Sequence, residues 1–534
     1  MIQENYREKN KIALISKMRP WLTAPEVDIA ETDLLPYKSI LFEKIIEDNG
    51  VKSTIINLDL LRFAEKVRPG ADVYELISQE VEKTEADWVI IDCLESSYVN
   101  TIVLTERIKK RNHDMKIVLT GLHPKTVSEK TLKNFEWIDF IIYGEEEIAV
   151  LEILEFIKGK KELDDLSNLV YKKNKKKITF NYLSGDNLPQ ADYSSYIKRN
   201  KEELPEKLVL ELEGGRGCPH KCLFCGDHDW QGNYRRKSNE KIIEEIKNNI
   251  EKTGVREFFF GDYNFGANMD ELSDFCKKVT DLSISWSCLL RIDDLTEEIL
   301  NELKSSGCVG FFFGMESGDP KIQKKIGKNI DINKADSIIE HSHNIGLKNT
   351  ASFIIGFPEE TLSSLEKTME KAVYYSKKGC KTELNHLIPM GNSDIFRKNK
   401  KNIYFDSLFY TRMIGEIKNN EIDLIKGYPE IFSFHYRIKN DRLSHYYLLA
   451  IYATSFLIDK FPETIASLAE KEGSVLNALK MVLNLPDKPQ QMRRKDFLKV
   501  MKDLSKNPEE HFGDILFTKE IKNNFIKDLT FKNL

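Results

Sequence analysis

Short apolar runs that alternate with helical patterns fill the chain between Lys11 and Lys158. Five of these runs have the length of buried strands: KIALIS, STIINL, DWVIID, KIVLTG and DFIIYG. The segments between them, such as Tyr98 to Arg111, carry apolar residues at helical spacing. Strands that alternate with helices favour a parallel sheet covered by helices on both faces. The pattern therefore predicts an α/β fold, with a doubly wound domain over residues 1–175.

The same alternation starts again near Leu208. Six further apolar runs follow: LVLELE, EFFFG, ISWSCLL, VGFFFG, TASFIIGF and KTELNHLI. Helical patterns such as Asn239 to Glu251 and Ile332 to Asn344 separate them. Six strand–helix units predict a partial (β/α)6 barrel over residues 206–395, where chemistry gathers at the carboxyl ends of the strands.

Two regions of the chain lack this alternation. Residues 176–205 are predicted to form a connection, with a small hairpin at about Leu169 to Asn181 followed by the turn-rich stretch GDNLPQADYSSY. Beyond Phe396 helical periodicity dominates, which predicts a mainly helical third domain over residues 396–534. At about 100–200 residues per domain, a 534-residue chain has room for these three domains.

The composition limits the classes of function. The chain is 41% hydrophobic and 31% charged, as in ordinary globular proteins. Its 80 basic and 85 acidic residues give a net charge of -5, which provides no field that favours nucleic acid or an anionic membrane. The sequence shows neither the apolar core of a signal peptide nor a run of about 18 apolar residues. We expect a cytoplasmic monomer that binds neither nucleic acid nor membranes.

Three of the eight cysteines, Cys218, Cys222 and Cys225, lie together on a glycine-rich loop after the first barrel strand. Cysteine thiolates are the usual iron–sulfur ligands, and a cubane with three protein ligands keeps one iron open. A zinc site completed by His220 or His228 is the main alternative, although the spacing and the absence of a second C-x-x-C pair weigh against it. The scattered cysteines are expected to pack as small hydrophobes: Cys93, Cys276, Cys288, Cys308 and Cys380.

Three other barrel loops add to this motif: GDYNF after the second strand, GMESG after the fourth and IGFPEET after the fifth. With the C-x-x-x-C-x-x-C loop, they make residues 206–395 resemble the radical S-adenosylmethionine (AdoMet) enzymes. The resemblance implies that the three loop cysteines bind a catalytic 4Fe-4S cluster whose open iron chelates AdoMet. The family often has a P-x-P-G-T-type turn after the sixth strand, but this chain has IPMGN. That departure leaves the rim of the substrate pocket undefined.

The resemblance also implies a set of AdoMet contacts: Phe224, Asp262, Asn264, Arg291, Glu316, Ser317 and Gly356. Glu316 or Ser317 would bond to the methionine or ribose part, and the backbone around Gly356 would accept the adenine. The residues also allow plainer roles. Glu316 would then cap a helix, Gly356 would form a turn, and Arg291 would make a surface salt bridge.

The loops after the third, fourth and fifth strands of the first sheet are CLESSY, GLHP and GEEE. A doubly wound sheet binds its ligand beyond the carboxyl ends of its strands, although glycines there are also plain turn formers. The order of this sheet, the G-x-H-P turn, the G-E-x-E turn and the cysteine loop resembles the cobalamin-dependent branch of the radical AdoMet superfamily. The resemblance implies a Rossmann-like cobalamin-binding domain with these contacts: Leu94, Glu95, Ser96, Ser97, Tyr98, Gly121, Leu122, His123, Pro124, Gly144, Glu145 and Glu147.

Two points qualify the cobalamin prediction. No D-x-H-x-x-G segment occurs, so the sequence supplies no histidine of that kind beneath cobalt. A corrin-free sheet that only braces the barrel is the alternative.

The resemblance implies a methyltransferase that forms a 5′-deoxyadenosyl radical and methylates an unactivated carbon from methylcobalamin. The substrate would be a natural-product precursor or a peptide, and the electron donor a flavodoxin or ferredoxin. Cyclisation, rearrangement or epimerisation without net methyl transfer is one alternative, and a non-catalytic cofactor-binding regulator is another. The carboxyl-terminal aromatics are candidates either for the substrate pocket or for simple core packing: Tyr428, Phe432, His435 and Tyr436.

Overall fold

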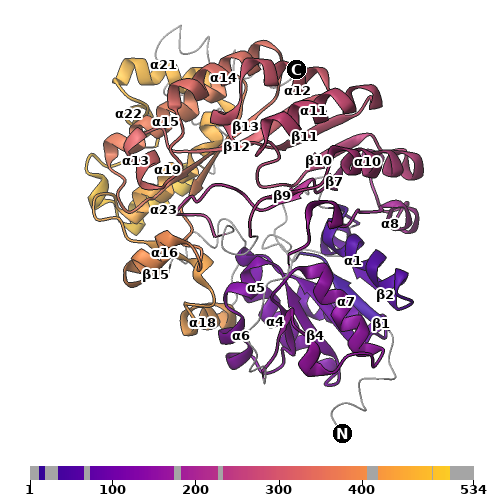
Figure 1. Cartoon of the computed structure of the whole chain (residues 1–534). Helices are drawn as coiled ribbons and strands as arrows, with labels where there is room; N and C mark the ends of the chain where they lie inside the picture. The colour runs from indigo at the N-terminus through magenta and orange to yellow at the C-terminus, as the bar shows by residue number, and fades with distance from the viewer. Residues whose placement is uncertain are drawn as a thin grey trace.

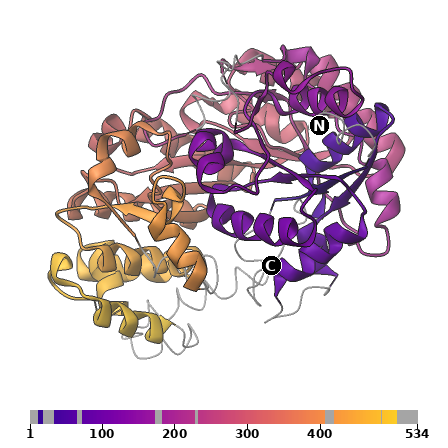
Figure 2. The ribbon, with the colours of Figure 1, turned by 90° about the horizontal axis from the view of Figure 1, so that it is seen from below.

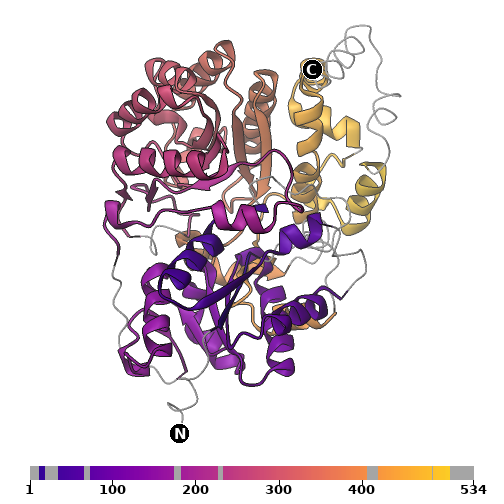
Figure 3. The same cartoon turned by 90° about the vertical axis from the view of Figure 1, so that its right-hand side faces the viewer.

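A computed structural model of the chain describes residues 11–17, 34–64, 72–172, 182–226, 232–405, 419–483 and 485–504. The amino-terminal domain, coloured indigo to magenta, lies below a second sheet with its own helices (Figure 1). The last helices, coloured yellow, lie beside this second sheet (Figure 3). No helix in the described part of the chain is both long and apolar enough to cross a membrane.

The amino-terminal sheet has the order β2-β1-β3-β4-β5-β6. Its first five strands are parallel and coincide with the five predicted runs: β1 (Lys11–Ile15), β2 (Lys52–Ile56), β3 (Trp88–Asp92), β4 (Lys116–Thr120) and β5 (Phe140–Ile142). The short β6 (Leu169–Val170) runs antiparallel to β5. It begins where the hairpin was predicted, whose remainder over residues 173–181 lies outside the described residues. The strand order reverses direction between β1 and β3, which is the topological switch point of the sheet.

Helices cover both faces of this sheet, because alternate strand residues point to opposite sides. Ala13 and Ile91 belong to one apolar cluster, and Ile12 and Ile90 belong to the other. The helices are α1 (Tyr37–Asp48), α2 (Leu58–Phe63), α3 (Val73–Lys83), α4 (Tyr98–Arg111), α5 (Leu122–Thr126), α6 (Ser128–Asn134) and α7 (Glu146–Ile157). The doubly wound fold is therefore confirmed.

The second sheet has six parallel strands in the order β7-β10-β11-β12-β13-β14. They are β7 (Leu210–Leu212), β10 (Glu257–Phe260), β11 (Ser285–Leu289), β12 (Cys308–Glu316), β13 (Thr350–Ile355) and β14 (Lys381–His386). Helices lie between them: α10 (Asn239–Thr253), α11 (Met269–Val279), α12 (Glu297–Ser305), α13 (Pro320–Lys325), α14 (Ile332–Asn344) and α15 (Leu362–Lys377). Because β7 and β14 do not pair, the barrel is partial, as the six strand–helix units predicted.

The carboxyl-terminal segment is mainly helical, with α16 (Asp394–Asn399), α18 (Asn419–Gly427), α19 (His445–Ala453), α20 (Ser455–Lys460), α21 (Pro462–Glu472), α22 (Val475–Leu483) and α23 (Arg494–Leu504). Helices α19 to α22 share one apolar core with the barrel. Helix α18 packs on the amino-terminal domain instead, beside a small antiparallel pair, β15 (Ile403–Phe405) and β16 (Tyr436–Ile438), that helical periodicity did not predict. The segment thus joins the two sheets along one side of the molecule (Figure 2).

Candidate active site at the cysteine loop and the domain interface

The cysteine loop leaves the barrel through a short antiparallel pair, β8 (Gly215–Arg216) and β9 (Arg235–Arg236). Arg216 lies opposite Arg235 in this pair, and Cys218 follows two residues later. The N–H of Leu223 donates to the Ile326 carbonyl at 2.9 Å, and the Ile395 N–H donates to the Leu223 carbonyl at 2.9 Å. The tip of the loop is therefore fixed by backbone bonds to α13 and α16.

The three thiols of this loop are half-buried, whereas the five scattered cysteines are fully buried, as predicted. Among the described residues, no three His, Cys, Asp or Glu side chains converge closely enough to hold one metal ion. A zinc site needs four donors within about 2.0–2.3 Å of one ion. Cysteines around a cubane bind different irons and need no such convergence. Of the two histidines that the zinc alternative invoked, His220 lies 3.7 Å from Asp294, and His228 lies outside the described residues.

Two cations lie near Cys222. Burial raises the pKa of the Cys222 thiol, while Lys328 and Arg291 act in the opposite direction. Positive charge of this kind stabilises thiolates and hence a thiolate-ligated cluster. Lys328 was not among the predicted residues, because no motif surrounds it.

Glu316 and Arg291, both predicted AdoMet contacts, lie near this loop but already have protein partners. Lys328 Nζ is 2.5 Å from Glu316 Oε1, and Arg291 Nε is 2.8 Å from Asp293 Oδ1. Glu316 has a φ of 61° at an irregularity in the β12–β13 pairing. A non-glycine residue in this conformation costs about 1–3 kcal/mol and is typical of ligand sites. Phe224 contacts Phe357 edge-on, with 6.1 Å between the ring centroids.

Asp262 and Asn264 follow β10 and are both buried. Burial raises the pKa of Asp262 to about 7. The Gly214 N–H, which donates to Asp262 Oδ2 at 2.9 Å, acts in the opposite direction and lowers this pKa. Neither the nitrogen nor the oxygen of the Asn264 amide has a hydrogen-bond partner in the described structure. A buried amide without partners costs about 1–3 kcal/mol per group, so Asn264 fits a ligand that offers both a donor and an acceptor.

Ser317 and Gly356 serve the protein's own packing. Ser317 Oγ lies 3.1 Å from Thr368 Oγ1 and accepts from the Asp319 N–H. Gly356 has a φ of +90°, and a Cβ there would lie 2.7 Å from the His386 ring. Its N–H donates to Glu360 Oε2 at 2.6 Å. The turn role that the sequence allowed for Gly356 is thus present, and any contact with adenine would come from its backbone.

Glu360 gives a prediction about pH. Burial raises the pKa of its carboxyl from 4.5 to about 8. The folded chain therefore holds this proton more tightly than the unfolded chain, and ionisation reduces stability as the pH rises from about 4.5 to 8. Glu360→Gln removes this loss and keeps an oxygen for the Gly356 N–H. We expect the Tm of the variant minus that of the wild type to rise from pH 5 to pH 8 and then level off. A difference that is constant with pH would contradict the assignment.

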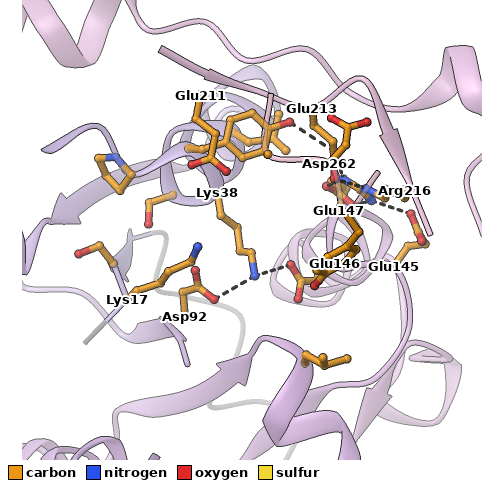
Figure 4. Close-up of a pocket in the computed structure, with 18 of the residues that line it drawn as sticks. Lys17, Lys38, Asp92, Glu145, Glu146, Glu147, Glu211, Glu213, Arg216 and Asp262 are labelled. Carbon is orange, nitrogen blue, oxygen red and sulfur yellow. Dashed lines mark hydrogen bonds and ion pairs between the residues drawn. The ribbon is translucent and has the colours of Figure 1, made fainter. Parts of the chain in front are cut away.

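A cavity of about 260 Å³ lies at the switch point of the amino-terminal sheet, between that sheet and the barrel (Figure 4). Ser16, Lys17 and Asp92 line it from the ends of β1 and β3, and Gly144 to Glu147 line it from the turn after β5. From the barrel, residues around the base of the cysteine loop and the end of β10 complete the lining: Glu211, Glu213, Gly215, Arg216, Gly261 and Asp262.

Lys38 crosses this cavity. Its Nζ lies 2.9 Å from Asp92 Oδ1 and 3.0 Å from Glu146 Oε2 (Figure 4). Burial opposes its charge, but the two carboxylates raise the pKa of Lys38 above its ordinary value. The ammonium is therefore charged and ion-paired. Neither Lys38 nor Asp92 was predicted, since single charged residues beside strands carry no distinctive pattern.

The predicted corrin contacts divide into two groups. Leu122, Gly144, Glu145 and Glu147 line the cavity. The contacts from Leu94 to Tyr98, together with Gly121, His123 and Pro124, are not among its lining residues. In the first group, Glu145 and Glu147 are ion-paired with the barrel.

The residues of the second group have partners within the protein. Tyr98 is fully buried, with its hydroxyl 3.1 Å from Thr131 Oγ1. His123 Nε2 lies 2.8 Å from the Ile431 carbonyl oxygen, and Ser433 Oγ donates to Glu95 Oε1 at 3.1 Å. The carboxyl-terminal segment therefore covers these loops. Gly121 has a φ of +113° and would bring a Cβ to 2.5 Å from the Cys93 carbonyl oxygen, so the local turn itself requires glycine.

The carboxyl-terminal aromatics belong to this covering contact. Phe432 and Tyr436 are buried in the apolar cluster of the amino-terminal domain, and Tyr428 lies against it. The Tyr428 ring lies 5.3 Å from that of Phe135. His435 is also buried, and burial lowers the pKa of its imidazole. None of these four lines the cavity, which agrees with the core-packing alternative.

Residues 212–372 match the model of the Radical SAM superfamily. An uncharacterized methyltransferase of Pyrococcus horikoshii is 28% identical over 305 residues, which cover 55% of this chain and 66% of the relative. The anaerobic magnesium-protoporphyrin IX monomethyl ester cyclase of Rubrivivax gelatinosus is 24% identical over 282 residues, or 49% of this chain and 50% of the relative. The match thus spans less than two thirds of each relative. Residues 212–372 form a radical SAM domain.

The similarity of fold extends well beyond this domain. OxsB, a cobalamin-dependent S-adenosylmethionine radical enzyme solved with aqua-cobalamin bound, superposes with a TM-score of 0.63 at 13% identity, over 99% of this chain and 84% of OxsB. The radical S-adenosylmethionine methyltransferase TsrM from Kitasatospora setae was solved with cobalamin and a [4Fe-4S] cluster. It superposes with a TM-score of 0.57 at 13% identity, over 75% of this chain and 81% of TsrM. The chain therefore shares the fold of these two solved enzymes.

Proposed function

We propose that this chain is a cobalamin-dependent radical SAM methyltransferase that methylates a carbon of a natural-product precursor or peptide. The observation that carries the proposal is the shared lining of one cavity. The carboxyl ends of the amino-terminal strands and the base of the cysteine loop both contribute to it. A sheet of this kind takes its ligand at the switch point, and a barrel places its chemistry at the carboxyl ends of its strands.

The relatives support methyl transfer as the reaction class. They include the Pyrococcus methyltransferase and the cytidylyl-2-hydroxyethylphosphonate methyltransferase of Streptomyces wedmorensis, which is 28% identical over 157 residues, or 28% of this chain and 29% of that relative. TsrM is also a methyltransferase. The magnesium-protoporphyrin cyclase favours the second candidate, which is ring formation without net methyl transfer.

In this proposal the residues of the chain bind and orient the reactants. Cys218, Cys222 and Cys225 hold the cluster, and the cations Lys328 and Arg291 favour the thiolate form of Cys222. When bound, the cluster and AdoMet supply a 5′-deoxyadenosyl radical, and methylcobalamin supplies the methyl group. The unpartnered Asn264 amide and the buried Asp262 are the candidates to hold the polar groups of AdoMet. Because the cluster must first be reduced, we also propose a flavodoxin or ferredoxin as electron donor.

The switch-point cavity is the proposed cobalamin site. Its position fits, but its volume of about 260 Å³ lies below the ~300–1,000 Å³ of typical ligand pockets. A corrin is larger than this, so its binding requires side chains that cross the cavity to move apart. Lys38 is the first of these, because it bridges Asp92 and Glu146 across the cavity.

The test is anaerobic reconstitution of the full chain with iron, sulfide and cobalamin. With AdoMet and a low-potential reductant, we expect 5′-deoxyadenosine to form, together with corrin and cluster absorption. In a screen of candidate precursors and peptides, a product heavier by one methylene unit supports methyl transfer. A product of unchanged mass or with hydrogen removed supports the cyclase candidate. Absence of 5′-deoxyadenosine from a fully loaded chain contradicts both candidates and favours a non-catalytic binding protein.

A further inference from the structure

Arg216 lies in β8, directly before the cysteine loop, and its guanidinium is surrounded by three carboxylates. Its Nη1 lies 2.7 Å from Glu145 Oε2 and 3.0 Å from Glu147 Oε2. Its Nη2 lies 2.6 Å from Glu147 Oε1 and 2.8 Å from Glu213 Oε2, and its Nε lies 2.9 Å from Glu213 Oε1. A guanidinium has five N–H donors. All five are therefore used on carboxylate oxygens.

Two of these carboxylates come from the other domain. Glu145 and Glu147 lie at the amino end of α7, in the turn after β5 of the amino-terminal sheet. They are 71 and 69 residues away from Arg216 in the sequence. Both are buried, and Arg216 itself is only 14% exposed. Burial acts to raise the pKa of the Glu147 carboxyl, but the nearby Arg216 outweighs this effect. The pKa of Glu147 therefore lies below its ordinary value. This contact between the domains is thus an ionised pair shielded from solvent.

Arg235 adds a second connection on the other strand of the same pair. Its Nη2 lies 3.0 Å from Glu145 Oε1, and its Nη1 donates to the Leu183 carbonyl at 2.7 Å. Arg216 and Arg235 are opposite each other in the β8–β9 register, so one arginine stands at each end of the cysteine loop. Glu145 bonds to both.

We infer that Arg216 and Arg235, through Glu145 and Glu147, form a clamp that fixes the base of the cysteine loop on the amino-terminal domain. They are positioning residues, since they act on the reaction through the cysteines that they orient. The clamp fixes the position of the cluster relative to the switch-point cavity. This part of the inference rests on the proposed function, because it assumes that the loop binds a cluster. Glu145 and Glu147 thereby gain a role different from the corrin contacts that the sequence suggested.

The fork geometry of arginine is essential to this role. A lysine in place of Arg216 has three donors on one nitrogen and cannot bond to three carboxylates in a plane. Removing the guanidinium leaves Glu145, Glu147 and Glu213 close together with Arg235 as the remaining cation of the clamp. Their repulsion would part the turn after β5 from the loop.

Hydrogen exchange of the full chain tests the clamp through two amides of the loop. The Leu223 and Cys225 N–H groups are bonded to the Ile326 and Cys222 carbonyls. We expect Arg216→Gln to accelerate their exchange at least about tenfold, because the loop then opens locally. Glu147→Gln should act in the same direction, and the double variant should add little, because both changes remove one interaction. Arg216→Lys should fall between Arg216→Gln and the wild type.

Arg199→Gln is the matched control. Arg199, at the end of α8 (Ser194–Arg199), pairs with Glu43 of α1 at 2.6 Å and 2.7 Å. It therefore also joins an arginine to a carboxylate of the amino-terminal domain, but on a helix that does not carry the cysteines. Its loss should leave the two loop amides unchanged.

A second measurement reads the cluster itself. In the reconstituted chain, addition of AdoMet should change the electron paramagnetic resonance spectrum of the reduced cluster less in Arg216→Gln than in Arg199→Gln. Wild-type exchange of the loop amides in Arg216→Gln would overturn the clamp, as would equal acceleration in Arg199→Gln. If Arg216→Gln does not fold, Glu147→Gln decides by the same criteria. Failure of the wild-type chain to take up a cluster would count against the proposed function, while the exchange result would still decide the clamp.

Discussion

Replacement of Cys218, Cys222 and Cys225 together with alanine is expected to abolish cluster binding and AdoMet cleavage. The thiolates are the ligands that the loop offers to iron, and the loop holds no other cysteine. The fold should survive, because the backbone hydrogen bonds of Leu223 with Ile326 and Ile395 hold the loop and do not involve the thiols. Iron and sulfide content after anaerobic reconstitution, the spectrum of the reduced cluster and the yield of 5′-deoxyadenosine measure the effect.

Cys288→Ala is the matched control for this triple variant. Cys288 lies in β11 and is buried in the barrel core, so its loss should cost some stability but no iron. Iron retained by the triple variant at the wild-type ratio would refute the cluster assignment. Zinc bound by the wild type in place of iron, and lost in the triple variant, would support the zinc alternative.

Lys237→Ala should strongly destabilise the barrel. Lys237 follows β9, and its Nζ lies 2.8 Å from Glu245 Oε2 of α10, with both side chains fully buried. The second oxygen of Glu245 accepts from the Ala191 N–H at 2.7 Å. Removing one partner of a buried ion pair costs about 3–5 kcal/mol, because the other charge is left unpaired. For a domain of this size we expect the Tm to fall by roughly 6–20 °C, which calorimetry measures.

The double variant Lys237→Met, Glu245→Leu separates the cost of an unpaired buried charge from the cost of lost side-chain packing. Both charges are then absent, and apolar side chains of similar volume fill the space. Its remaining cost should be about 1–3 kcal/mol, the penalty for the Ala191 N–H that loses its acceptor. A double variant as unstable as Lys237→Ala would show that packing, not the unpaired carboxylate, causes the loss.

The strand and helix positions were predictable because their signals are local. An apolar run such as DWVIID is too short for a helix and becomes β3, and α4 follows from the helical spacing of Tyr98 to Arg111. The small β15–β16 pair was not predictable, because its strands are three residues each and 30 residues lie between Phe405 and Tyr436. The cysteine spacing is also local, since three thiols within eight positions share one loop whatever surrounds them.

The placement of the candidate ligand contacts depended on distant partners. Glu145 and Tyr98 were equally good candidates in the sequence, because each follows closely after a predicted strand of the first sheet. The structure puts Glu145 at the cavity beside Arg216 and Tyr98 in the core, because the segment around Ile431 covers the loops next to Tyr98. No local pattern records which distant segment covers a loop.

The sequence by itself therefore determined the two parallel sheets and the three-cysteine loop, because apolar periodicity and ligand spacing act over a few residues. The tertiary structure alone decided that Arg216 meets Glu145 and Glu147 and that Lys38 bridges Asp92 and Glu146. Such contacts depend on how two domains pack, and charge complementarity across an interface leaves no periodic signal in either segment.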